Sequence, residues 1–259
     1  MNGNATKGRT GMTFAYNQLN LPKTATKTGV SVNYLYDGTG NRLQKKLVEG
    51  ANTVIYYGPD KNGQYGFLDN NGAIYSGNDA FAGQLSKALG DLRSGGATGS
   101  GLVNDLMTST SNFELVSRSR NSAYENGTYI SWNPTGTSGA SDQNGSNQRP
   151  SYIGLGHEMA HIQDVWNGTY NNKTLSTVSL PDGTSKNIKR AEIYATHIVN
   201  RIRPENCLSL RVSYRIDGSG GADPSTWIIK SSTNQSLYFN SKGVNNYKRL
   251  GRKVSPFTF

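Results

Sequence analysis

Cysteine is almost absent from this chain, and its scarcity limits the chemistry that the chain can perform. Cys207 is the one cysteine among 259 residues, so an intramolecular disulfide and a zinc site built from thiolates are both excluded. A chain that folds without disulfides can fold and act in a reducing cytosol. Any metal site must therefore use imidazole and carboxylate groups.

Long apolar runs are missing as well. No segment approaches the roughly 18 consecutive apolar residues that a membrane-spanning helix requires. Residues 1–10 lack the apolar core of a classical signal peptide. We therefore expect a soluble chain with no membrane span and no classical export signal.

Acidic residues are missing from the C-terminal part of the chain. None follows Asp223, whereas six basic residues do, and the formal net charge of the chain is +10. Such a tail favours an acidic partner. The basic residues are not densely interleaved with aromatic ones, as they are in proteins that bind single-stranded nucleic acid. We therefore interpret the tail as a solvated surface and keep nucleic-acid binding as a minor alternative. The six basic residues are Lys230, Lys242, Lys248, Arg249, Arg252 and Lys253.

Apolar residues make up only 34% of the chain, and 31 residues are glycine. This composition is typical of a loop-rich α+β protein rather than a helical bundle. The 15 tyrosines, 7 phenylalanines and 3 tryptophans can still anchor a core, which argues against disorder. The length suffices for one catalytic domain preceded by a short extra module.

Two related segments occur near the N-terminus, YNQLNLPK at 16–23 and YDGTGNRL at 36–43, with their tyrosines 20 residues apart. Each predicts a strand that ends in tyrosine and is followed by a Gly/Asn turn, so such units would stack into an extended sheet. The segments resemble the tyrosine-aspartate (YD) repeats of rearrangement-hot-spot (Rhs) proteins. The resemblance implies a β-rich YD-repeat segment over 1–62 and a variable toxin domain after it. The alternative is an ordinary pair of tyrosine-rich hairpins.

Helices and strands alternate in the rest of the chain. A helix is expected from Asn78 or Asp79 through Leu92, followed by a glycine-rich break at 95–101. Pro150 suits the first turn of a helix that Asn167-Gly168 ends, and Pro204 should stop another helix. The remaining predicted elements are strands at 113–116 and 128–132, a hairpin of 175–180 with 184–188 around 181–183, a helix at 189–203, a strand at 208–214 and a turn at 217–221.

The motif HEMAH lies at 157–161, within the predicted helix that begins near Pro150. Residues four apart on a helix lie about 40° apart around its axis, so His157 and His161 can present two imidazoles to one zinc ion. Glu158 follows the first histidine and can accept a proton from a zinc-bound water. Two buried core histidines, or a structural zinc site, are the alternatives. The motif predicts a zinc-dependent endopeptidase.

A catalytic zinc usually has three protein ligands, so one more is needed. Glu192 and His197 both lie on the predicted helix at 189–203, but five residues turn a helix by about 140°, so only one of them can face the metal. We prefer Glu192, because the nearby Ala195 would let the two helices approach closely; His197 is the alternative. Asp164 could orient a ligand histidine through a hydrogen bond, or could be a solvated carboxylate.

Three stretches together, HEMAH at 157–161, EIYA at 192–195 and LSLRVSY at 208–214, resemble the NleD-type effector metallopeptidase family. The resemblance implies a zincin-like fold over 63–259, a glutamate third ligand and cleavage of a protein inside another cell. The Arg-x-x-Tyr pair is also similar to that of clostridial neurotoxin light chains. This implies that Tyr214 donates to the oxyanion and that Arg211 stabilises charge near the substrate carbonyl. Cys207 stands where the family often has glycine.

Residues 128–134 precede the motif helix and could form an edge strand to which an extended substrate adds; a buried core strand is the alternative. The resemblances imply a toxin or effector that a larger Rhs carrier delivers to a target-cell cytosol, where it cleaves a protein, and for which a cognate immunity protein could exist. Two other functions remain open. The chain could be a non-enzymatic YD-repeat binding or structural module, or a basic toxin that binds nucleic acid.

Overall fold

The structure is a computed structural model that describes residues 6–7, 11–27, 30–36, 42–49, 52–55, 57–59, 65–67, 80–109, 111, 113–179 and 184–259. The chain divides into two compact units, Met1–Ser86 and Lys87–Phe259. The domain boundary predicted between residues 62 and 63 lies outside the described residues and stays a prediction. No helix in the described part of the chain is both long enough and apolar enough to cross a membrane.

The first unit contains an antiparallel meander of five strands, and each strand pairs with the next in the sequence. Tyr16 and Tyr36 end the first and third strands, as the repeat pattern predicts; the turn at 37–41 lies outside the described residues. The strands are β1 (Thr13–Tyr16), β2 (Pro22–Lys27), β3 (Val30–Tyr36), β4 (Arg42–Glu49) and β5 (Asn52–Ile55), and a separate hairpin follows, β6 (Tyr57–Pro59) with β7 (Tyr65–Phe67).

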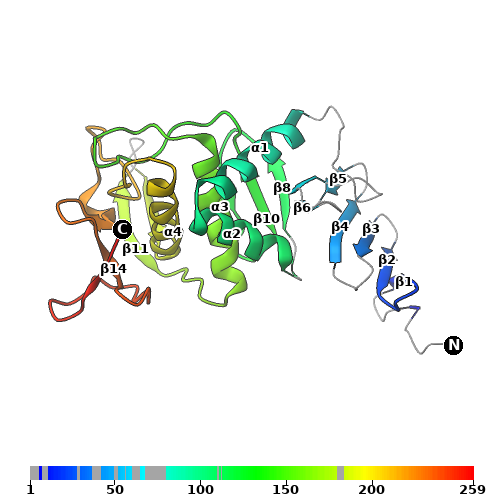
Figure 1. The fold of residues 1–259 in the computed structure, drawn as a ribbon. Helices are drawn as coiled ribbons and strands as arrows, with labels where there is room; N and C mark the ends of the chain where they lie inside the picture. The colour runs from blue at the N-terminus through cyan, green and yellow to red at the C-terminus, as the bar shows by residue number, and fades with distance from the viewer. Residues whose placement is uncertain are drawn as a thin grey trace. The chain divides into compact units, whose positions relative to one another are not determined.

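Helices form the centre of the second unit. They are α1 (Ala80–Gly95), whose first residues belong to the first unit, α2 (Ala97–Thr108), α3 (Ser151–Trp166) and α4 (Ala191–Glu205). Helix α3 packs against both α2 and α4 (Figure 1). Three predicted helices are confirmed: the one that carries Leu85 and Leu92, the one that begins near Pro150 and the one at 189–203. The predicted caps of the first, Asn78 and Asp79, lie outside the described residues. The prediction that Pro204 stops this helix is wrong by one residue, since α4 includes Pro204 and ends at Glu205. The N–H groups of Asn206 and Cys207 then bond to the carbonyl oxygens of Arg203 and Pro204 in a tight turn.

Helix α2 corrects the predicted glycine-rich break at 95–101. Gly99 lies inside this helix, and a Cβ atom there would stand 2.0 Å from the carbonyl oxygen of Leu92, so the glycine allows two helices to approach closely. The Glu205 carboxylate, at the end of α4, accepts hydrogen bonds from the N–H groups of Thr98 (2.8 Å) and Gly99 (3.1 Å). Gly99 therefore serves close packing, and the carboxylate that caps the start of α2 comes from a residue more than 100 positions away.

A three-stranded sheet lies beside α3, in the order β8 (Glu114–Ser117), β10 (Tyr129–Trp132), β9 (Ser122–Ala123). Strand β10 is parallel to β8 and antiparallel to β9. Because β10 is central and its Ile130 and Trp132 are buried, the expectation that 128–134 forms an edge strand is wrong. The alternative, a core strand, is right, and β9 forms an edge of this sheet instead.

The last third of the chain adds two small sheets. The predicted hairpin is confirmed as β11 (Thr174–Ser179) with β12 (Ser185–Lys189), and its tip at 181–183 lies outside the described residues. Strands β13 (Ile229–Lys230), β14 (Gln235–Asn240) and β15 (Pro256–Thr258) follow the short 3-10 helix η1 (Pro224–Thr226). Strand β14 packs against α4.

The prediction of a strand at 208–214 is wrong. This segment forms isolated bridges, from Arg211 to Asp142 and from Ser213 to Trp227, rather than a continuous ladder. Two side chains of α4, those of Asn200 and Arg203, form hydrogen bonds with part of its backbone. The turn at 217–221 is confirmed, with the Asp217 carboxylate accepting hydrogen bonds from two backbone N–H groups.

Candidate metal centre

Helix α3 holds His157, Glu158 and His161 in a buried position. Its residues from Ile153 to Ile162 are all buried, which the apolar run around the motif predicts. Gly156 lets α1 come close, since a Cβ atom at this position would lie 3.1 Å from the Leu92 side chain. The motif is therefore fixed by helix packing on several sides.

Helix α4 brings Glu192 to the two histidines. The Glu192 Oε2 atom lies 3.0 Å from the Nε2 atom of His157 and 3.1 Å from that of His161. The imidazole rings are nearly perpendicular, with centroids 4.9 Å apart. Their ligand atoms and the carboxylate oxygen all lie within 4.8 Å of one another. Three side chains from two helices thus converge at one point.

The Nδ1 atoms of both histidines are buried and lack a hydrogen-bond partner among the described residues. Their Nε2 atoms face the Glu192 carboxylate. Each imidazole therefore points its Nε2 atom, which a metal ion could bind, toward the Glu192 carboxylate. Two imidazoles and one carboxylate are a donor set that suits zinc.

Burial and the Glu192 carboxylate together set the protonation of the two histidines in this cluster. Burial lowers the pKa of His157 to about 4. Burial opposes the charging of His161 too, but the Glu192 carboxylate prevails and raises the His161 pKa to about 9. Although burial works against the Glu192 carboxylate, the charge of His161 and hydrogen bonds from both histidines hold its pKa below the ordinary value. Without a metal, the cluster therefore keeps one proton on His161 at neutral pH.

His197 lies elsewhere, in an aromatic cluster at the C-terminal sheet. Its ring stacks on Phe239 with centroids 3.6 Å apart and an interplanar angle of 5°, and Phe257 and Phe259 flank it. Burial lowers the His197 pKa to about 3, with a smaller contribution from Arg201. The structure therefore groups Glu192, and not His197, with the two motif histidines.

Asp164 is fully buried, so it is not a solvated carboxylate. Its Oδ1 atom accepts a 2.5 Å hydrogen bond from the Thr169 hydroxyl. Its Oδ2 atom and the Nδ1 atom of His161 each lack a partner among the described residues. The carboxylate thus fastens the chain after α3 to the helix and makes no hydrogen bond to the histidine.

Glu158 lines both pockets that adjoin the histidines. Burial raises the pKa of its carboxyl group to about 7, while the charges of His161, Arg149 and Arg211 act in the opposite direction. A carboxylate with a pKa near neutrality can both accept and release a proton under physiological conditions. It is the group in this cluster best suited to general base chemistry.

Tyr214 faces the same cluster from the segment after α4. Its ring lies nearly parallel to that of His157, with centroids 6.0 Å apart. Burial raises the Tyr214 pKa well above its usual value, and the Glu192 carboxylate adds to this effect. The phenol therefore keeps its proton and can donate a hydrogen bond to a group bound in the site.

Arg211 supports the turn that presents Tyr214. Its guanidinium group donates to the carbonyl oxygens of Ser213 (2.9 Å) and Tyr214. Its Cζ atom lies 5.1 Å from the centre of the Tyr214 ring, within the range of a cation–π contact. The two residues of the Arg-x-x-Tyr pair are thus in direct contact, and both line the larger pocket.

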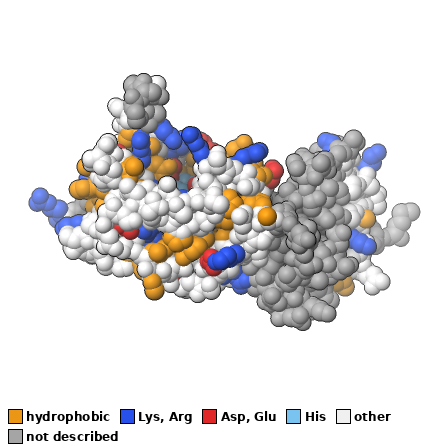
Figure 2. Space-filling model, turned by 90° about the horizontal axis from the view of Figure 1, so that it is seen from above, with side chains coloured by type: hydrophobic (Ala, Val, Ile, Leu, Met, Phe, Trp, Pro, Cys, Tyr) orange, Lys and Arg blue, Asp and Glu red, His pale blue; other side chains and the backbone are white. Residues whose placement is uncertain are grey.

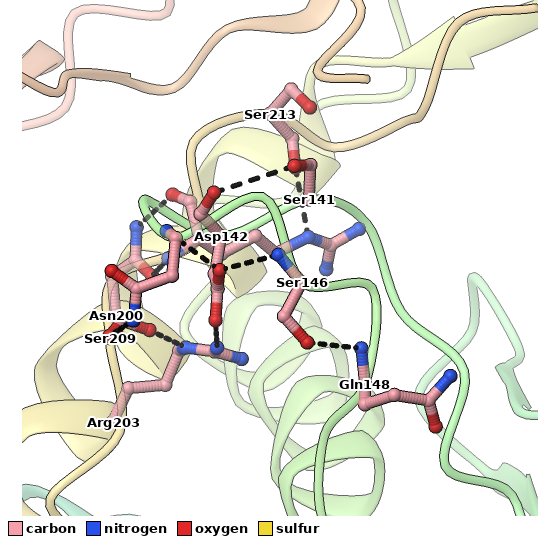
Figure 3. A network of polar contacts seen from close by, with 10 residues as sticks. Ser141, Asp142, Ser146, Gln148, Asn200, Arg203, Ser209 and Ser213 are labelled. Carbon is pink, nitrogen blue, oxygen red and sulfur yellow. Dashed lines mark hydrogen bonds and ion pairs between the residues drawn. The ribbon is translucent and has the colours of Figure 1, made fainter. Parts of the chain in front are cut away.

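A polar network that the sequence pattern did not indicate holds this segment in place (Figure 3). The Asn200 side chain donates to the carbonyl oxygen of Arg211 and accepts from its N–H group, both at 2.8 Å. Arg203 donates to the carbonyl oxygen of Ser209 and forms an ion pair with Asp142 (3.5 Å). Two residues of α4 therefore position the backbone that leads to Tyr214.

Two pockets border the histidines. The larger, of about 450 Å³, extends from Glu158 and Tyr214 past Arg149 and Arg215; the smaller, of about 250 Å³, lies between β9, β12 and Tyr170. Seen from above, histidine atoms are visible in a hollow among Lys and Arg side chains (Figure 2). Sequence reasoning missed Asn121, Arg149 and Tyr170 as lining residues, because no local spacing connects them with the motif.

Two helices that bring two histidines and a glutamate to one point, beside an open cleft and a small mixed sheet, define an α/β protein with a candidate metal-dependent hydrolase site. Residues 69–214, more than half of the chain, match the family Peptidase M91, described as effector protein. The chain therefore belongs to this family of peptidase effectors. No curated protein and no solved structure gives a significant match.

Proposed function

We propose that the chain is a zinc-dependent endopeptidase, and that His157, His161 and Glu192 hold the metal. The observation that carries the proposal is the convergence of both Nε2 atoms on one Glu192 oxygen, at 3.0 and 3.1 Å. Family membership supports the peptidase activity. Zinc bound by two imidazoles and one carboxylate would polarise the scissile carbonyl and make a water molecule acidic enough to act near neutral pH.

Glu158 is the proposed general base. Its carboxylate borders both pockets, and its pKa of about 7 suits the transfer of a proton from the attacking water to the leaving amine. Tyr214 would donate its phenolic proton in a hydrogen bond to the oxyanion that forms on the carbonyl carbon. Arg211, which contacts the ring and the backbone carbonyl of Tyr214, would keep this donor in position and add positive charge close to the carbonyl.

A zincin-like catalytic domain over 63–259 is part of the proposal. Within it, the edge strand β9 and strand β12 both line the smaller pocket. An extended peptide could add to such an edge through main-chain hydrogen bonds, which would place its carbonyl near Glu158. The substrate-binding role first assigned to 128–134 thus passes to β9.

The last part of the proposal is that an Rhs-type carrier delivers the catalytic domain. The Tyr-ended strands β1 and β3, which lie in one antiparallel meander, support a YD-repeat-like segment over 1–62. In this proposal the segment is the end of a carrier and 63–259 is the toxic cargo, which cleaves a protein in the cytosol of a target cell. A cognate immunity protein would protect the producing cell.

Two measurements test the proposal. Elemental analysis of the purified protein should find about one zinc per chain, and little in His157→Ala or His161→Ala. Comparison of protein termini in cells that express the wild type or Glu158→Gln should identify cleavage sites specific to the wild type. A protein that stays free of zinc after supplementation, or a Glu158→Gln variant that produces the same termini, would contradict it.

A further inference from the structure

We propose that the larger pocket binds a negatively charged side chain of the substrate, and that Arg149 and Arg215 recognise it. The inference rests on the proposed peptidase function and adds a requirement for a carboxylate or phosphate group close to the scissile bond. It follows from the charges and hydrogen bonds of the pocket.

The lining of this pocket is strongly basic. Five cationic side chains contribute to it against one acidic side chain, that of Glu158. A concave surface lined by one sign of charge concentrates the field and attracts the opposite charge. The five cations are Arg149, Lys186, Arg203, Arg211 and Arg215.

Two of the five cations are committed to the framework of the protein. Arg203 is paired with Asp142 and with the carbonyl oxygen of Ser209. Arg211 donates to the backbone carbonyl oxygens of Ser213 and Tyr214. These two arginines support the pocket wall, so a ligand must be recognised by others.

Arg149 and Arg215 have donors to spare. The hydrogen bond that the structure describes for the Arg149 guanidinium is a long one, 3.4 Å, to the carbonyl oxygen of Pro150. The buried Nη1 atom of Arg215 has no partner among the described residues. A buried donor without a partner is costly, and a guanidinium group matches a carboxylate or phosphate in charge and in geometry.

The position of Arg149 places the anion close to the proposed chemistry. A Cβ atom on Gly154 would stand 2.1 Å from Nη1 and 2.5 Å from Nη2 of Arg149, so the guanidinium group lies directly on α3 where this glycine leaves room. Glu158 follows four residues later and shares this face of the helix. Burial lowers the Arg149 pKa to about 10, which still leaves a full positive charge at neutral pH.

The same pocket also has apolar walls. Ile153 and Val199 line it from α3 and α4, and Ile188 lines it from β12. Such walls accept an aliphatic stem while the arginines bind the charged end. A glutamate, an aspartate or a phosphorylated side chain at one fixed position of the substrate meets both conditions.

The test measures binding without cleavage, so it can fail independently of the proposed activity. Zinc-loaded Glu158→Gln protein is titrated with three pools of nine-residue peptides that are randomised except at the centre, where the residue is glutamate, phosphoserine or glutamine. Fluorescence anisotropy reports the affinity of each pool. We expect the glutamate pool, the phosphoserine pool or both to bind about tenfold more tightly than the glutamine pool.

Variants and a competitor decide the outcome. In the Glu158→Gln background, Arg149→Gln combined with Arg215→Gln should remove the preference, whereas Arg252→Gln, on an exposed part of the chain, should keep it. Inorganic phosphate should displace the acidic pool from the parent protein, a measurement that requires no pocket variant. Equal binding of the three pools overturns the inference, and so does a preference that survives the double substitution in a variant with unchanged zinc content.

Discussion

Asn200 clamps the backbone of Arg211 with two hydrogen bonds of 2.8 Å, one to its carbonyl oxygen and one from its N–H group. The clamp joins α4, which also carries Glu192, to the segment that carries Tyr214. Amide side chains with both groups satisfied in a buried position specify one backbone geometry.

Asn200→Ala should therefore disturb Tyr214 without touching the zinc ligands. The loss of two buried hydrogen bonds should lower the free energy of unfolding by about 1–3 kcal/mol, measured by denaturant titration. The catalytic rate should fall about tenfold to a hundredfold because the oxyanion donor shifts, while zinc content stays at about one per chain. Asn246→Ala, at an exposed position, is the control, and full activity in Asn200→Ala would refute the positioning role.

Replacement of Glu158 by glutamine should separate metal binding from catalysis. The amide has the same shape but cannot accept the proton of the attacking water, so the rate should fall by a factor of about 10² to 10⁴. Zinc content should be unchanged, because the three proposed ligands remain in place. Elemental analysis and a cleavage assay on the same preparation check both expectations, and loss of zinc from this variant would assign Glu158 a different role.

Zinc binding should release about one proton per chain at pH 7. The His157 pKa is about 4 and the His161 pKa is about 9, so between these two values the metal-free cluster holds one proton, on His161. A ligating imidazole must be neutral, so zinc has to displace that proton. The apparent affinity should then rise about tenfold per pH unit from pH 6 to about pH 9.

Titration calorimetry in two buffers of different ionisation enthalpy measures the released proton directly. Glu158, with a pKa of about 7, could add to the count, so the Glu158→Gln variant serves as the matched control. Zinc affinity that does not change with pH would show that His161 is already neutral in the metal-free protein.

The third ligand can be tested by a pair of substitutions on α4. Glu192→Ala removes the carboxylate that both histidines face and should abolish stoichiometric zinc binding. His197→Ala removes a ring that stacks on Phe239 and meets Phe257 edge to face. It should lower the free energy of unfolding by about 1–3 kcal/mol with zinc retained. Measured zinc content with the opposite pattern would assign the ligand role to His197.

The contact between α2 and its neighbours yields a prediction outside the site. Glu205→Ala removes the carboxylate that caps two N–H groups of α2 and should cost about 1 kcal/mol of folding stability. Gly99→Ala should cost more, because the new methyl group would meet the Leu92 carbonyl oxygen. Gly101→Ala is the matched control, because the new methyl group meets open space inside the same helix. Gly168 is not suitable as a control, because its positive φ of 69° would strain any other residue.

The sequence was sufficient wherever the relevant spacing is local. The histidines of α3 follow from a four-residue helical spacing, and the end of that helix follows from Asn167-Gly168, the glycine having a positive φ. The turn of about 100° per helical residue shows that Glu192 and His197 cannot both face one metal ion. The structure places Glu192 beside the two histidines and His197 on Phe239.

Non-local partners explain what the sequence did not predict. Helix α2 was missed because the carboxylate that accepts hydrogen bonds from its first N–H groups belongs to Glu205, the last residue of α4. The predicted strand at 208–214 was wrong because Asn200 satisfies the backbone of Arg211 in place of a neighbouring strand. The central place of β10 depends on its parallel pairing with β8, which no alternation of residues in either strand specifies.

Helix α4 carries Glu192, Asn200, Arg203 and Glu205 in this order, and each one meets a different part of the second unit. A single added residue turns everything beyond it by about 100° and shifts it by about 1.5 Å. One insertion between Glu192 and Asn200 would therefore uncouple Glu192 from Arg211 and from α2 together, although every side chain would still be present. The number of residues between these four side chains therefore matters as much as their identity.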